Sequence, residues 1–124
     1  MRIIIKTKNL ELTKDLKISA EEKIGSLKKF IDILKENTPD GEKTLAEVFV
    51  ELEKETTHHK KGNIFLATVQ VNLPGKSLRA QSREEDPMRA IVEVREELKK
   101  EVEKYKAKNT EKRRREQRKT KLGL

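Results

Sequence analysis

Only a few residues of this chain have types and spacings that could do chemistry. The pair His58–His59 suggests a metal site, but adjacent histidines cannot easily hold one ion, and no cysteine or spaced third ligand accompanies them. The run Glu84–Asp86 suggests paired carboxylates, yet it precedes a predicted helix, where acidic residues cap the chain and favour the helix dipole. We therefore predict loop histidines and capping carboxylates, with no bound metal and no cofactor.

The chain carries no nucleophile beside a base and no glycine-rich phosphate loop. We therefore predict that it is not an enzyme and that it has no small-molecule substrate. Cysteine is absent, which excludes disulfides and thiolate metal sites. No apolar run is long enough to span a bilayer, and the amino terminus is too short and polar for a secretion signal. These features predict a cytoplasmic protein with no membrane partner.

Positive charge is the feature that points to a binding partner. The net charge is +8, and residues 106–124 contain nine basic and two acidic side chains. The remaining residues hold 21 basic and 20 acidic side chains, so this part of the chain is nearly neutral. A basic tail is a common feature of nucleic-acid-binding proteins, although it is also found on helix ends that only aid solubility.

The stretch from Leu78 to Lys108 is predicted to form a last strand, a sharp turn and a long helix. Asp86 is a suitable N-cap, and Pro87 suits the first helical position because its missing N–H costs nothing there. Apolar residues then recur on one helical face: Ile91, Val94, Leu98, Val102 and Tyr105. This apolar stripe ends at Tyr105, so we expect helical order to be lost after about Lys108.

The first part of the chain predicts a strand and an amphipathic helix. Residues 2–7 are rich in β-branched side chains, which favours a strand. Thr13 is a plausible N-cap for one helix that reaches about Glu36. The apolar stripe of this helix is Leu16, Ala20, Ile24, Leu27, Ile31 and Leu34. Gly25 lies within the helix and weakens it by about 1 kcal/mol relative to alanine.

Three further segments alternate between apolar and polar residues, as strands do: 45–55, 64–73 and 76–83. Their short connections predict an antiparallel meander, with the first strand beside the second at the sheet edge. The order β-α-β-β-β-α predicts an α+β fold, in which a four-stranded sheet carries both helices on one face.

The opposite face of this sheet is predicted to lie in water and to be mostly acidic. Its residues are Glu47, Glu51, Glu53, Arg79 and Gln81. A phosphate backbone should avoid such a face and meet the helices, the loops or the tail instead.

On the second helix, the cations are Arg89, Arg95, Lys99, Lys100, Lys104, Lys106 and Lys108. Along a groove between two helices they could follow a phosphate backbone, although mixed charges more commonly just solvate a helix.

Three stretches together resemble a known family. They are IKTKNLELTKDLKISAEEKIGSLKKF (5–30), HHKKGNIFLATVQVNLPGKSLRA (58–80) and EEDPMRAIVEVREELKKEVEKYK (84–106). In this order, and with the same predicted elements, residues 2–108 resemble the ribosome hibernation-promoting factors. That family includes ribosome-associated inhibitor A and the proteins once called sigma-54 modulation proteins.

The resemblance implies a fold like that of double-stranded-RNA-binding domains. It implies a translation inhibitor that binds the small ribosomal subunit in the mRNA and tRNA channel, contacts 16S rRNA through both helices and stabilises hibernating ribosomes in stationary or stressed cells. The residues that match basic positions of the family are Lys23, Lys29, Arg83, Lys100 and Lys104. We add Arg89 and Lys108 to this expected rRNA-binding set because of the charge pattern of the second helix.

This sequence also departs from the family pattern. Ser26 and Glu97 stand where family members often have lysine, so the basic groove is interrupted. We expect a ribosome-binding domain over residues 1–108 and a flexible basic tail over 109–124, without the separate dimerisation domain of the long forms. The tail cations Arg113, Arg114 and Arg115 are expected to add rRNA contacts that offset the weakened groove.

Two other functional classes remain open at this stage. One is a general double-stranded-RNA-binding module that acts away from the ribosome and binds isolated duplexes as well as it binds ribosomes. The other is a protein-interaction module that uses the acidic side of the sheet and has little salt-sensitive affinity for RNA.

Overall fold

The computed structural model describes the backbone of residues 1–36, 46–55, 62–73 and 76–121. Within these ranges it also describes the side chains, except those of residues 33–36, 106 and 109–121. The pair His58–His59 and the turn at Pro39–Gly41 lie outside the described residues.

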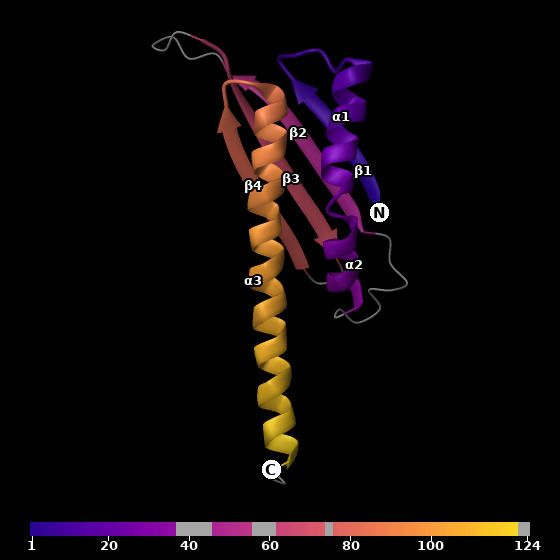
Figure 1. The fold of residues 1–124 in the computed structure, drawn as a ribbon, viewed down its shortest axis with the longest axis vertical. Coiled ribbons are helices and arrows are strands. Elements are labelled where there is room, and N and C mark those ends of the chain that lie inside the picture. The colour runs from indigo at the N-terminus through magenta and orange to yellow at the C-terminus, as the bar shows by residue number, and fades with distance from the viewer. Residues whose placement is uncertain (37–45, 56–61, 74–75, 122–124) are drawn as a thin grey trace.

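The described residues form a sheet of four strands with helices on one face (Figure 1). Along the chain the elements are β1 (Arg2–Lys8), α1 (Lys14–Gly25), α2 (Lys28–Glu36), β2 (Glu47–Glu55), β3 (Ile64–Leu73), β4 (Lys76–Glu84) and α3 (Pro87–Lys121). The strand order is β1-β2-β3-β4, so each strand lies beside its neighbour in sequence. This arrangement confirms the predicted α+β fold.

Strand β1 pairs with β2 in parallel, whereas β2–β3 and β3–β4 are antiparallel. A parallel pair needs a crossover between its strands, and α1 and α2 provide it. The antiparallel pairs are the predicted meander, and β3 has the predicted bounds. The predicted place of the first strand beside the second is also confirmed.

The core lies between the inner face of the sheet and the helices. Alternate residues of β2 and β3 are buried, as period-2 patterning requires, and the apolar face of α3 packs over them. On α3 the buried residues of the predicted stripe are Ile91, Val94, Leu98 and Val102, while Tyr105 is partly buried at its end. No buried side-chain polar atom in the described part of the chain lacks a hydrogen-bond partner.

Both predicted N-caps are present. The backbone N–H of Leu16 donates to the hydroxyl of Thr13 over 3.2 Å, which satisfies one free donor of α1. The backbone N–H of Met88 donates to the carboxylate of Asp86 over 2.7 Å at the start of α3. These caps fix where the chain turns from strand to helix.

The prediction of a single helix from Thr13 to Glu36 was wrong, because the helix is interrupted. Helix α1 ends at Gly25 and α2 begins at Lys28. The Ser26 hydroxyl donates to the carbonyl of Lys23 over 2.7 Å, and the Leu27 N–H donates to the carbonyl of Ile24 over 3.0 Å. A glycine followed by a serine that bonds back to the chain favours such a break.

Helix α3 continues to Lys121, beyond the predicted loss of order near Lys108. In Figure 1 the second half of α3 extends beyond the ends of the strands and beyond α2. Good helix formers such as glutamate, lysine and arginine dominate the sequence after Tyr105, so intrinsic propensity continues the helix where the apolar stripe has ended.

The open face of the sheet is not mostly acidic, which corrects the sequence prediction. Its basic residues are Arg2, Lys6, Lys8, Arg79 and Arg83, and its acidic residues are Glu47, Glu51, Glu53 and Glu55. The prediction considered only the meander and left out β1, whose register places its basic residues opposite the glutamates of β2. The Nζ atom of Lys8 lies 3.7 Å from a carboxylate oxygen of Glu53. The open face is therefore close to neutral, and the cations of β1 lie in register beside glutamates of β2.

Candidate nucleic-acid interface

The outer surface of the three helices gathers cations from distant parts of the chain. Helices α1 and α2 lie side by side with α3 on the same face of the sheet (Figure 1). Lys23 on α1 and Lys29 on α2 are exposed, and so are Arg89, Lys100, Lys104 and Lys108 on α3. The fold thus brings six of the predicted rRNA-binding residues to the layer of helices.

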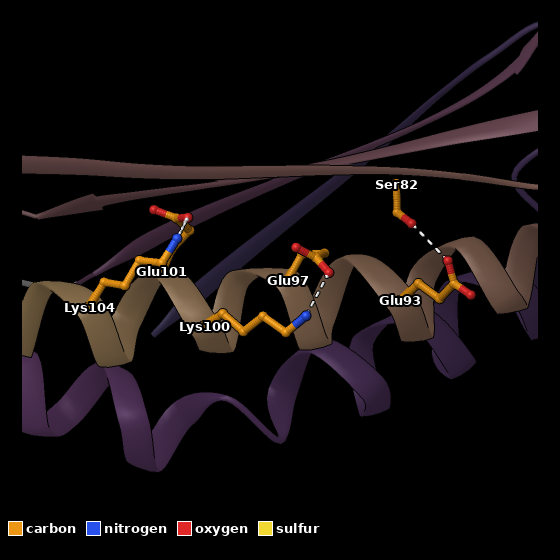
Figure 2. Close-up of polar contacts among 6 residues, drawn as sticks. All are labelled: Ser82, Glu93, Glu97, Lys100, Glu101 and Lys104. Carbon is orange, nitrogen blue, oxygen red and sulfur yellow. Dashed lines mark hydrogen bonds and ion pairs between the residues drawn. The ribbon is translucent and has the colours of Figure 1, made fainter.

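Two of these lysines are paired with glutamates of their own helix. The Lys100 ammonium lies 3.1 Å from the Glu97 carboxylate, and that of Lys104 lies 3.5 Å from Glu101. Figure 2 shows both lysine side chains lying along α3 toward these glutamates. Exposed pairs of this spacing contribute only about 0.3–0.5 kcal/mol each. A phosphate group can therefore displace the glutamates at little cost.

Arg83 lies apart from the lysines of the helical surface. It projects from β4, and its Nε lies 3.4 Å from the carboxylate of Glu55 on the open side of the sheet. Arg83 and Arg89 line one hollow at the turn from β4 to α3, together with Ile64, Glu84 and Glu85. Arg83 therefore lies at this turn with only Arg89 of the predicted cations beside it.

A pair of carboxyl groups joins β4 to α3 beside this turn. Ser82 donates to Glu93 over 3.0 Å (Figure 2), and Glu93 also shares a hydrogen bond with Glu84. That bond, with partial burial and the negative charge of Glu93, raises the pKa of Glu84 above its ordinary value. The pKa of Glu93 is lowered by its hydrogen bonds with Glu84 and Ser82 and by the charge of Arg89. Of the two carboxyl groups, Glu84 therefore keeps its proton to the higher pH.

Two lysines that differ in sequence position by 70 residues meet at one aromatic ring. The ammonium of Lys29 lies 5.2 Å from the centre of the Phe30 ring, and that of Lys99 lies 5.1 Å from it. Exposed cation–π contacts of this kind contribute about 0.5–1 kcal/mol. The charge pattern placed Lys99 on the second helix but did not select it as a site residue. Only the packing of α2 against α3 shows which flank of the helix it occupies.

A third aromatic contact lies near the end of the sheet. The ammonium of Lys76, at the start of β4, lies 5.6 Å from the centre of the Tyr105 ring. Tyr105 is partly buried against the core, so this contact ties α3 to the β3–β4 hairpin where the helix leaves the sheet. Lys104 and Lys108, just before and just after Tyr105, are exposed.

The tail residues Arg113, Arg114 and Arg115 fall within the backbone of α3, while their side chains lie outside those that the structure describes.

Within the described ranges, no group of three or more histidine, aspartate or glutamate side chains is placed to hold a metal ion. No helix in those ranges combines the length and the hydropathy that crossing a membrane requires.

The fold is shared with solved structures of low sequence identity. The N-terminal domain of Protein Y from Thermus thermophilus is 23% identical, with a TM-score of 0.63 over 85% of this chain and 99% of that domain. A ribosomal subunit interface protein from Coxiella burnetii is 17% identical, with a TM-score of 0.63 over 86% of this chain and 99% of that protein. No curated protein matches this chain.

A family model is more decisive because it matches most of the sequence. The model of the sigma 54 modulation protein / S30EA ribosomal protein family covers residues 3–110. The matched region runs from β1 into α3 and contains the three stretches on which the resemblance to hibernation-promoting factors rests. The chain therefore belongs to the sigma 54 modulation protein / S30EA ribosomal protein family.

Proposed function

We propose that this protein is a ribosome-associated translation inhibitor. It binds the small subunit in the channel for mRNA and tRNA, contacts 16S rRNA and stabilises inactive, hibernating ribosomes. It acts by occupying the channel and catalyses no reaction. Membership of the family supports association with the ribosome, and the cations gathered on the helical layer supply the means of contacting RNA.

The observation that carries the proposal is that the fold brings cations from separate parts of the chain onto one layer of helices. On the open face, cations of β1 lie in register beside the glutamates of β2, so that face offers little net attraction for RNA. The pairs are Arg2 with Glu47, Lys6 with Glu51 and Lys8 with Glu53. On the helical side, α1 and α2 present Lys23 and Lys29 beside the cations of α3. Weak ion pairs within α3 can be exchanged for contacts with phosphates, since such exchange also releases condensed counterions from the RNA.

Recognition on this surface depends on backbone and shape. Charged side chains, both basic and acidic, protrude from the helices, whereas Phe30 and Tyr105 are both partly buried against the core. Few rings are thus available to stack on unpaired bases. Contacts with phosphates across a folded RNA surface are the mode that fits these residues.

A cell-free translation assay tests the proposal. Purified protein added to ribosomes before mRNA should inhibit synthesis, with half-inhibition near one copy per small subunit. Addition after initiation should inhibit much less, since mRNA and tRNA then occupy the channel. Equal inhibition in both orders, or equal affinity for isolated RNA duplexes and ribosomes, points instead to a general double-stranded-RNA-binding module.

We further propose that residues 1–108 form the ribosome-binding domain and that the basic residues after them add contacts with rRNA. Replacing Arg113, Arg114 and Arg115 with glutamine should lower the slope of log affinity against log salt by roughly 2 to 3, at about 0.9 for each lost phosphate contact. A variant that loses Lys6, Lys8 and Arg79 removes the same charge from the open face and should change the slope little. Equal slopes for the arginine variant and the unmodified protein contradict a role for the tail.

A further inference from the structure

We propose that Phe30 is a platform that holds Lys29 and Lys99 as a paired binding site for the phosphates of an RNA backbone, at the junction of α2 and α3. The proposal rests on the proposed function, because it names a site within the same helical surface. It adds two residues that the family resemblance does not supply, Phe30 and Lys99.

The ring of Phe30 is held in place by its packing. Phe30 lies in the first turns of α2 and is partly buried against the core cluster. It follows Leu27 and precedes Ile31, which are both completely buried, so the start of α2 is anchored to the body of the domain. Contacts between α2 and α3 hold the ring beside the flank of α3 that carries Lys99.

The two ammonium groups are near each other, although they come from different helices. Each lies just over 5 Å from the centre of the same ring, at 5.2 Å for Lys29 and 5.1 Å for Lys99. They are thus within roughly 10 Å of each other, which is about one Debye length at 0.1 M salt. An anionic chain that passes the ring can therefore contact both ammonium groups.

Neighbouring carboxylates leave this pair uncompensated. Within the described part of the chain, no carboxylate forms an ion pair with Lys29 or Lys99, in contrast to Lys100 and Lys104. The glutamate one turn before Lys99, Glu96, is bound by Arg95 over 3.2 Å. Asp32 on α2 and Glu103 on α3 are the other acidic residues on neighbouring turns. The contact with the ring offsets part of the charge of each lysine but leaves all ammonium donors available to an acceptor.

The ligand chemistry follows from these features. Two ammonium groups that contact the same ring, at most about 10 Å apart, suit two phosphates of one RNA backbone. An unpaired base fits poorly, because lysines already occupy the ring. Holding both lysines before binding reduces the side-chain entropy lost when the phosphates are bound. Phe30 is therefore a positioning residue, whereas Lys29 and Lys99 contact the RNA.

The test compares the affinity of ribosomes for four variants at several salt concentrations. Lys29→Gln and Lys99→Gln should each lower the affinity three- to tenfold and lower the salt slope by about 0.7–0.9, as loss of one phosphate contact does. Phe30→Leu keeps an apolar side chain at the core but removes the ring, and it should lower the affinity about threefold. Lys6→Gln, on the open face, removes the same charge and should leave the affinity unchanged.

Coupling between the variants separates a platform from independent charges. In the Phe30→Leu background, Lys99→Gln should weaken binding by clearly less than it does in the unmodified protein, because the lysine is no longer held. Full additivity overturns the platform, as does unchanged affinity of Phe30→Leu when both lysine variants are weakened. If all three variants bind like the unmodified protein, the paired site is refuted while the proposed function stands.

A second measurement keeps the proposal testable if the protein does not bind ribosomes, or if Phe30→Leu does not fold. NMR signals of the lysine side-chain ammonium groups can be followed in the unmodified protein during titration with a short RNA duplex. The signals of Lys29 and Lys99 should shift together at a concentration where that of Lys6 is unaffected. Shifts of equal size at all three lysines indicate non-specific attraction and refute the site.

Discussion

Replacing Gly25 with alanine should stabilise the protein, although this glycine lies where the first helix is interrupted. Gly25 is the last residue of α1, and its φ is not in the left-handed region, so alanine can adopt the same conformation. A Cβ atom built at this position meets no other atom within 4 Å. Glycine within a helix costs roughly 0.5–1 kcal/mol relative to alanine. At a terminal position we expect the lower value, a gain of about 0.5 kcal/mol, which corresponds to a rise in Tm of roughly 2–4 °C for a domain of this size.

Thermal unfolding followed by circular dichroism measures this gain, and a second glycine provides the matched control. Gly62 also has no atom within 4 Å of an added Cβ, but its φ is +113°, a conformation that L-residues rarely adopt. Gly62→Ala should therefore lower the Tm, whereas Gly25→Ala should raise it. The two substitutions add the same methyl group into open space and differ in backbone conformation alone.

The result also bears on RNA binding. If Gly25→Ala lowers the Tm, the account of the α1–α2 break is refuted, because the break then depends on a conformation that only glycine provides. If the Tm rises and the affinity for ribosomes is unchanged, the glycine has no part in the interface. A higher Tm combined with weaker binding shows that a bound phosphate backbone approaches α1 at the bare Cα.

Other predictions concern the turn between β4 and α3 and the core beneath it. Asp86→Ala should cost about 1 kcal/mol of unfolding free energy, measured by urea denaturation, because the Met88 N–H loses its acceptor; a cost no larger than that of Asp86→Asn contradicts the capping role. Leu98→Ala, at a completely buried position, should cost about 2–5 kcal/mol in the same assay, whereas Lys100→Ala, two residues away on the exposed side of the helix, should cost less than 1 kcal/mol. Glu84→Gln should remove a contribution to the pH dependence of the protein's stability. The raised pKa of Glu84 stabilises the protein below its ordinary value of 4.5 and this contribution is lost as the pH rises through the folded-state pKa. Glutamine is uncharged at every pH, so the Tm of the variant should exceed that of the unmodified protein at neutral pH but not below pH 4.5; equal Tm values at neutral pH contradict an unfavourable contact between the two ionised carboxylates.

Much of this fold could be predicted from the sequence because its signals are local. Alternation of apolar residues located β2 and β3, and Thr13 and Asp86 are capping residues whose hydrogen bonds form within three residues. The stripe from Ile91 to Tyr105 identified the buried face of α3. These features depend on neighbouring residues, so no tertiary information was needed.

The errors arose where competing local effects or distant contacts decide the structure. The apolar stripe continues across Gly25 and Ser26, so periodicity concealed a break that a serine hydroxyl and a glycine together produce. The charge of the open face was misjudged because the cations of β1 come from a distant segment, and only the register of β1 with β2 places them there.

The candidate site shows the same division. Resemblance to the family identified Lys23, Lys29 and Lys100, and the fold gathers them on the helical layer. The sequence does not show which lysine forms an ion pair with a glutamate. Lys99 and Lys100 are adjacent, and both have glutamates one turn away. The packing of α2 against α3 separates them, with Lys99 over Phe30 and Lys100 beside Glu97.

The most direct test of the proposed function is co-sedimentation of the purified protein with vacant ribosomes through a sucrose gradient, at low and at moderate salt. Binding should saturate near one copy per small subunit at both salt concentrations, and it should be lost when mRNA and tRNA are added first. Binding that appears only at low salt and persists in the presence of mRNA and tRNA contradicts the account, because it shows non-specific attraction between basic residues and RNA.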